Sequence, residues 1–242
     1  ANGVDGRSGL LRGGLLGSWR EWTGIASVNA LRGDYRVGSR LRDGDDRANS
    51  TVLYPELSMT RVFARDRIRP KSGASVRLTA RAASTAVGSD VVLAQLRAEG
   101  RYVMSFGDAG RLLTRLELGW TDTDRFDQLP PDLRFFAGGD SSVRGYAWRD
   151  LGPRDIDGNP IGAPRVVTAT LEYDRVFRPD WSWAVFVDGG NAFEGSDVAP
   201  EFGVGGGLRW ASPIGPVRLD LAYGLDEEVG GFQLHFSAGP DL

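Results

Sequence analysis

Apolar and polar residues alternate with a period of two along most of the chain. Between 217 and 223, for example, valine, leucine and tyrosine alternate with Arg218, Asp220 and an alanine. Successive side chains of a β-strand point to opposite faces, so this pattern predicts strands with one apolar and one polar face. It predicts eleven strands, at 8–20, 22–36, 50–64, 73–85, 89–106, 110–123, 164–178, 181–191, 201–212, 216–226 and 230–239.

Several of these strands are longer than the roughly 5–6 residues of an ordinary globular strand. The segments 89–106 and 164–178 match the roughly 9–11 residues that cross a bilayer at a tilt, with some overhang. Six tryptophans stand near segment ends, as in an interfacial aromatic belt: Trp19, Trp22, Trp120, Trp181, Trp183 and Trp210.

The connections between the strands alternate in length. Short ones lie at 106–110, 178–180 and 212–215, and long polar ones lie at 36–50, 124–163 and 191–200. Short turns on one side and long loops on the other are typical of an outer-membrane β-barrel, in which the polar faces line the lumen. The pattern favours an all-β, antiparallel transmembrane barrel and leaves a soluble β-sandwich open.

Composition excludes several other classes. The chain has no cysteine and one histidine, which argues against disulfide scaffolds, zinc sites and thiol catalysis. Its net charge is only −3, so no polybasic surface for nucleic acid is expected. No apolar run reaches the roughly 18 residues of a membrane helix. We expect no enzyme, no cofactor and no metal.

Three local patterns suggest chemistry and have simpler explanations. His235 could belong to an outer-membrane phospholipase, but it falls on the polar side of its strand and no G-x-S-x-G elbow exists. The glycines at 203 and 205–207 match no phosphate-binding pattern. The acidic groups at 155–157 and at Asp43, Asp45 and Asp46 lack a complete calcium loop and are interpreted as solvated turns.

Motifs in the second half of the chain resemble a known family. Residues 130–146 read PPDLRFFAGGDSSVRGY, 186–190 read FVDGG, 209–216 read RWASPIGP, and the chain ends in GPDL. The first resembles the VRGY segment, and the second the F-x-D-x-G strand motif, of the BamA/TamA/FhaC superfamily of outer-membrane assembly and secretion proteins. The combination is most similar to the TamA-like barrels of the translocation and assembly module.

The resemblance implies a sixteen-stranded barrel preceded by periplasmic POTRA domains. The eleven predicted strands would be the C-terminal eleven, so residues 1–242 are expected to be a barrel fragment without its first strands and POTRA domains. The long loop at 124–163 would be extracellular and fold into the lumen.

The resemblance also implies the site residues. Arg144 of the loop and Asp188 of a strand are expected to pair inside the lumen, because Val185 and Val187 take the lipid-facing positions; the alternative is that each is a separate solvated charge. Supporting residues would be Gly138, Gly139, Val143, Gly145 and Tyr146 in the loop, and Phe186 and Gly190 in the strand. Phe135 and Phe136 are expected to pack the loop against the barrel wall.

The function implied is insertion or export of other outer-membrane proteins, such as autotransporters, with no covalent chemistry. Clients would enter through a lateral seam whose C-terminal strand carries Phe232, Leu234 and Phe236. The expected partners are lipid, client polypeptides and a TamB-like periplasmic protein, with no nucleic acid. A two-partner-secretion pore of the FhaC kind is the alternative, and a passive porin is a weaker one.

Overall fold

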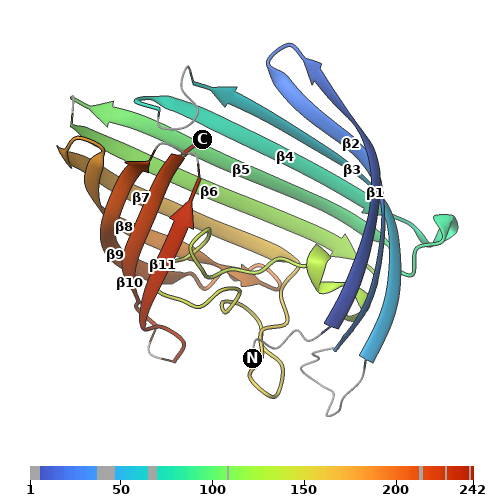
Figure 1. Ribbon diagram of the computed structural model, residues 1–242. Coiled ribbons are helices and arrows are strands. Elements are labelled where there is room, and N and C mark those ends of the chain that lie inside the picture. Colours follow the sequence, from blue (N-terminus) through green and yellow to red (C-terminus); the bar gives the residue numbers. More distant parts are fainter. Residues whose placement is uncertain are drawn as a thin grey trace.

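The protein is described by a computed structural model at residues 6–36, 47–64, 70–107, 109–212, 215–226, 228–239 and 241–242; Asp43, Asp45 and Asp46 lie outside these ranges. The described residues form one eleven-stranded antiparallel sheet in which every strand pairs with its neighbours in sequence (Figure 1). The predicted all-β class is confirmed. The strands are β1 (Gly6–Trp19), β2 (Trp22–Arg36), β3 (Arg47–Phe63), β4 (Gly73–Ala83), β5 (Leu93–Phe106), β6 (Gly110–Thr123), β7 (Arg165–Arg178), β8 (Trp181–Phe193), β9 (Glu201–Ser212), β10 (Gly215–Gly224) and β11 (Phe232–Ala238).

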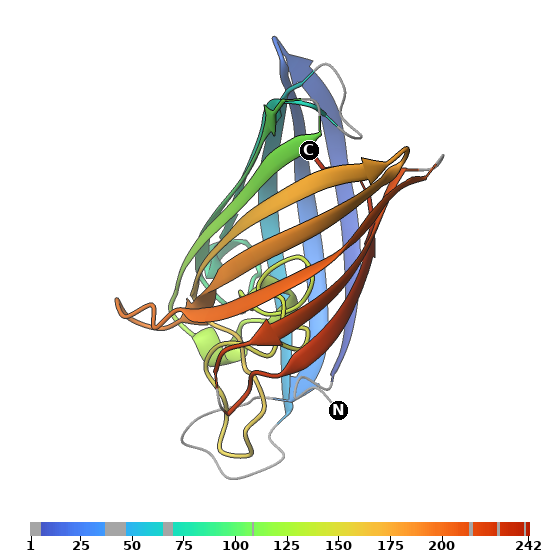
Figure 2. The ribbon, with the colours of Figure 1, turned by 90° about the vertical axis from the view of Figure 1, so that its left-hand side faces the viewer.

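The sheet is tilted and strongly curved, as in the wall of a barrel (Figure 2). Side chains alternate between its faces: on β8, Val185 and Val187 are 51% and 39% exposed, whereas Phe186 and Asp188 are 6% and 0% exposed. The convex face is therefore apolar and the concave face, which we call the lumen, carries the polar residues. Strands β1 and β11 are the two ends of the sheet order.

The connections fall into two groups. Antiparallel order places the turns after odd-numbered strands at one end of the sheet and those after even-numbered strands at the other. The two-residue turns at 20–21 and 179–180 belong to the first end, where Trp181 and Trp210 stack with ring centroids 6.1 Å apart. The longest connection, between β6 and β7, belongs to the second. Among the described residues no helix is long and apolar enough to cross a membrane.

Residues 124–164, which we call the inner segment, lie on the concave side of the sheet (Figures 1 and 2). The segment contains two single-turn 3-10 helices, η2 (Phe126–Gln128) and η3 (Pro131–Leu133). Its apolar residues join those of the wall in two buried clusters. One cluster includes Leu129 and Leu133 with Val52 and Leu93, and the other includes Phe135, Val143, Tyr146, Val166 and Ala192.

Two predicted strands differ most from the structure, and both are shorter than the sequence pattern suggested. The strand expected at 89–106 begins at Leu93, because the preceding residues form the 3-10 helix η1 (Thr85–Val87) and a turn. Asp90 fixes this turn by accepting a hydrogen bond from the Thr51 amide at 2.6 Å and donating its own amide to the Thr51 carbonyl at 2.9 Å. The strand expected at 230–239 covers only Phe232–Ala238, and the Gly230 amide instead closes a turn onto the Asp226 carbonyl.

Candidate functional site

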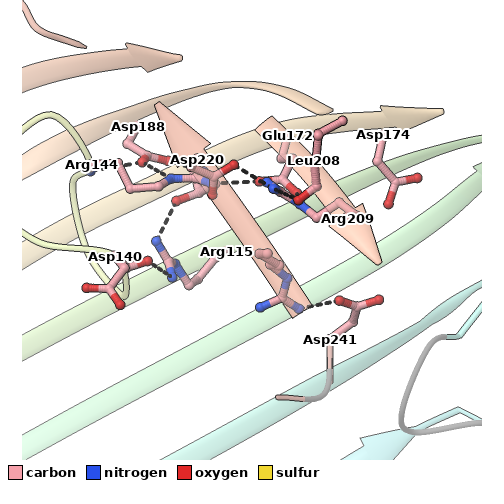
Figure 3. A network of polar contacts seen from close by, with 12 residues as sticks. Arg115, Asp140, Arg144, Glu172, Asp174, Asp188, Leu208, Arg209, Asp220 and Asp241 are labelled. Atoms are coloured by element: carbon pink, nitrogen blue, oxygen red, sulfur yellow. Dashed lines mark hydrogen bonds and ion pairs between the residues drawn. The ribbon is translucent and has the colours of Figure 1, made fainter. Parts of the chain in front are cut away.

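The structure brings Arg144 of the inner segment against Asp188 of β8 (Figure 3). The guanidinium donates from Nε to Asp188 Oδ2 at 2.7 Å and from Nη2 to Oδ1 at 3.0 Å, a bidentate arrangement. The backbone amide of Arg144 donates to Asp188 Oδ2 as well, at 3.0 Å. Asp188 has no exposed surface and Arg144 is 5% exposed.

Arg144 also contacts carboxylates on two further strands. Its Nη1 donates to Glu172 Oε2 of β7 at 2.8 Å and to Asp220 Oδ2 of β10 at 3.0 Å. Arg209 of β9 bridges the same two acids, with Nε donating to Glu172 Oε1 at 3.1 Å and Nη1 donating to Asp220 Oδ1 at 2.5 Å. We call these five residues the lumenal ion cluster: Arg144, Glu172, Asp188, Arg209 and Asp220.

The charges of the lumenal ion cluster nearly balance, since two guanidiniums face three carboxylates. All five side chains are buried, so their contacts are little screened by water. Burial alone would lower the pKa of Arg144, but the hydrogen bonds that it donates to Asp188 and the charges of Asp188, Glu172 and Asp220 raise it above its ordinary value. Arg144 is therefore held as a cation, and removing it would leave three buried carboxylates around one arginine.

Glycines make room for the backbone next to Arg144. Gly145 has φ +93°, and a Cβ there would lie 2.4 Å from the backbone nitrogen of Gly224. A Cβ at Gly203 of β9 would lie 1.8 Å from the carbonyl oxygen of Arg144. Gly203 thus lets the inner segment approach the wall, whereas Cβ atoms at Gly205 and Gly207 would meet the neighbouring strand β10, so no phosphate site is needed to explain these glycines.

The remaining motif residues support this arrangement from both sides. Phe186 of β8 lies under Arg144, whose Cζ is 3.3 Å from the ring centroid. Val143 and Tyr146 are fully buried, and the Tyr146 hydroxyl donates to the Phe202 carbonyl at 2.9 Å. The remaining motif glycines are Gly138 and Gly139, whose amides bond to Ser142 Oγ and the Val143 carbonyl, and Gly190, paired with Thr168 and Glu201. Phe135 is buried in the second cluster, whereas Phe136 is only half-buried and lies beneath Arg149.

The residues of the expected seam strand lie on the convex face of β11. Phe232, Leu234 and Phe236 are 73%, 70% and 67% exposed. Between them, His235 points to the lumen and its Nε2 accepts a hydrogen bond from the Gly145 amide at 3.2 Å. One end strand of the sheet is therefore tied to the residue that follows Arg144.

Sequence reasoning did not identify Glu172, Arg209 and Asp220 as partners of Arg144. A signal was present, because each is charged and lies on the lumenal parity of its strand. The motifs contain no information on which of the many lumenal charges would meet. That depends on strand register: Asp188 pairs with Gly203, while Asp220 pairs with Gly207.

The acidic turn at 155–157 is closed by hydrogen bonds from backbone amides to the side chain of Asp155. Asp155 Oδ1 accepts hydrogen bonds from the amides of Asp157 at 3.0 Å and Asn159 at 2.8 Å. In the described part of the chain, no group of three or more histidine, cysteine or acidic residues is placed to hold a metal ion.

Known proteins are similar to this chain in sequence and in fold. The Omp85 superfamily domain matches residues 32–241. The outer membrane protein assembly factor BamA of Nitratidesulfovibrio vulgaris (strain Hildenborough) is 38% identical over 126 residues, which are 49% of this chain and 15% of that protein. BamA from Haemophilus ducreyi lacking POTRA domains 1–3 superposes with a TM-score of 0.76 and 18% identity, over 98% of this chain and 54% of the other. CdiB from Acinetobacter baumannii aligns with a TM-score of 0.46 and 15% identity, over 98% and 50%.

The chain thus spans about half of the solved BamA chain and a small part of the curated one. The superposition with BamA supports the barrel fold, and the family match covers most of the sequence, including the strands that carry the lumenal ion cluster. The protein belongs to the Omp85 superfamily of outer-membrane β-barrel proteins.

Proposed function

We propose that this chain is the C-terminal part of a barrel that assembles other outer-membrane proteins. Membership of the Omp85 superfamily and the similarity to a BamA assembly factor support the proposal. The structural observation that carries it is a buried inner segment fixed to several wall strands and also tied to the end strand β11.

The physical mechanism is strand addition. An end strand such as β11 offers backbone N–H and C=O groups to the edge strand of an unfolded client. In hydrocarbon an unpaired edge is costly, so the edge must be paired or exchanged rather than left open. The contact of His235 with the Gly145 amide couples the position of the inner segment to β11. This function requires no covalent bond to be made or broken, and we propose no enzymatic activity.

The test is client insertion with the edge locked. The full-length protein is placed in liposomes and the folding rate of a denatured outer-membrane barrel is measured. Leu234→Cys is then oxidised to a cysteine on the first strand of the full-length barrel, and we expect insertion to stop and to return on reduction.

A matched control pairs Leu219→Cys with Leu208→Cys, which are register partners on β10 and β9. This disulfide crosslinks two wall strands that are already paired and should leave insertion unchanged. Normal insertion by the Leu234 lock would refute strand addition at β11.

We further propose a TamA-like role, with autotransporter-type clients and a TamB-like periplasmic partner. Support comes from the resemblance of residues 130–146 and of the ending residues to that branch. The experiment is co-purification of the full-length protein with its periplasmic partners. Recovery of assembly lipoproteins in place of a TamB-like protein would assign it to BamA-type assembly. Secretion of one soluble polypeptide, with no client inserted, would instead favour the FhaC kind.

A further inference from the structure

The lumen contains a cavity of about 690 Å³ beside the lumenal ion cluster. It is lined by strands β3–β7 and β10, by the inner segment and by residues 237–239, 241 and 242. Among its lining residues are Arg101 of β5 and Arg115 of β6, which are register partners. Like charges directly opposite each other in a sheet are destabilising unless something compensates them.

In the described part of the chain no carboxylate forms an ion pair or hydrogen bond with either arginine; Glu99 and Asp241 act on Arg101, and Asp188 and Glu172 on Arg115, only through their charge at longer range. Arg101 is exposed to the cavity and makes no hydrogen bond or ion pair there. Arg115 donates only to neutral oxygens, at 2.8 Å to the Ser142 carbonyl and at 3.0 Å to Thr170 Oγ1, with a longer contact to the Asp140 carbonyl. The sheet neighbours that flank the pair in register are Ser75 and Thr170.

The adjacent pair of like charges, by contrast, has ion-pair partners from the chain itself. Glu99 and Glu117 are also register partners on β5 and β6. Arg97 lies 2.9 Å from Glu117 and 3.4 Å from Glu99, and Arg77 lies 3.8 Å from Glu99. The chain thus forms ion pairs between the glutamate pair and its own arginines, and leaves the arginine pair next to it with no acid of the described residues in direct contact.

The same cavity already holds one carboxylate on a segment that is not part of the sheet. Asp241 follows β11 and enters the lumen, where its Oδ2 accepts from Arg111 Nη1 at 2.9 Å and its Oδ1 accepts from Arg218. Leu242 lines the cavity beside it. Unpaired polypeptide with an acidic side chain therefore fits this space, and its carboxylate is recognised by arginines from two strands.

We propose that Arg101 and Arg115 bind a carboxylate on a polypeptide segment that enters this cavity. The segment would carry an acidic side chain and, like residues 241 and 242, would not be paired into the sheet. Charge-assisted hydrogen bonds from arginine would select carboxylates over amides of the same shape. This inference does not require the proposed assembly function, because it concerns equilibrium binding by the resting barrel.

The probe is a fluorescein-labelled glycine–serine peptide with two central aspartates, compared with a twin that has asparagines. Binding to the full-length protein in detergent is measured by fluorescence anisotropy. We expect the acidic peptide to bind at least about tenfold more tightly, as charged hydrogen bonds allow. Arg101→Gln should remove that preference, and because the Arg101 side chain makes no hydrogen bond or ion pair with the described residues the fold should be kept.

Arg125→Gln is the matched control, since Arg125 is exposed on the inner segment and does not line the cavity. It should keep the preference for the acidic peptide. Equal binding of the two peptides, or an equal loss in both variants, would overturn the proposal. Displacement of the acidic peptide by inorganic phosphate at low millimolar concentration would also overturn it, in favour of a site for small oxyanions.

Discussion

Arg134 and Arg144 lie ten positions apart in the inner segment and are buried to nearly the same extent, at 7% and 5% exposure, yet they contact different groups. Arg134 donates to the carbonyls of Leu129, Ile161 and Asp127, all within the segment. Arg144 donates to carboxylates on three strands of the wall. One arginine folds the segment on itself, and the other fastens the folded segment to the barrel.

The two sites also differ electrostatically. Burial lowers the pKa of Arg134 to about 10, because Tyr35 and Asp127 offset only part of the desolvation. At Arg144 the carboxylates of Asp188, Glu172 and Asp220 outweigh burial and raise the pKa. Neutral carbonyl acceptors are enough to brace a loop locally, whereas joining separate elements here uses paired charges.

The largest expected effect comes from Arg144→Ala. It would leave three buried carboxylates around Arg209, and breaking a buried pair from one side costs about 3–5 kcal/mol. In the full-length protein we expect that loss in urea unfolding. We also expect rapid hydrogen exchange at the Gly145 amide, which donates a hydrogen bond to His235 in the intact protein. A loss below about 1 kcal/mol would contradict the assignment of Arg144 as the main attachment.

Arg134→Ala should weaken the internal fold of the inner segment and leave its attachment to the wall intact. Three carbonyls would lose a charged donor, at a cost of about 1–3 kcal/mol because water can replace part of it. The Ala163 amide, bonded to the Phe135 carbonyl at 2.8 Å, should exchange faster, while the Gly145 amide stays protected. If both amides lose protection together in either variant, the segment is a single unit and the distinction between brace and attachment is wrong.

Much of the fold was predictable because a strand in a barrel wall repeats one simple rule. All eleven strands follow from alternation, and residues such as Val187 and Asp188 fall on the faces that it predicts. The predicted start of β5 was wrong because Asp90 fixes its turn through one side-chain and one backbone hydrogen bond to Thr51, which leave the apolar pattern undisturbed.

The site was predictable only in part. Arg144 and Asp188 stand in recognisable motifs, but Glu172, Arg209 and Asp220 are ordinary lumenal charges until the register of four strands is known. Arg134 gave no signal at all, because its partners are backbone carbonyls that every residue possesses.

Gly203→Ala tests the attachment from the side of the wall. The added Cβ would meet the Arg144 carbonyl at 1.8 Å, so the backbone must move, and overpacking of this kind costs about 1–3 kcal/mol. The control is Gly100→Ala on β5, where a Cβ has no neighbour within 4 Å. Equal unfolding midpoints for the two variants would mean that the inner segment can shift at no cost.

The smallest effect is expected from Tyr146→Phe, which removes the two neutral hydrogen bonds of the hydroxyl and leaves the lumenal ion cluster intact. The Phe202 carbonyl would keep its hydrogen bond from the Leu225 amide at 2.8 Å, so only the Asp226 amide loses its acceptor. Neutral hydrogen bonds contribute about 0.5–1.5 kcal/mol, and the free energy of unfolding measured in urea should fall by no more than that. Because the ring stays buried, the Gly145 amide should remain protected from exchange. If Tyr146→Phe instead destabilised the protein as much as Arg144→Ala, attachment would depend on the packing around Val143 and Tyr146, and the ion cluster would be a minor contributor.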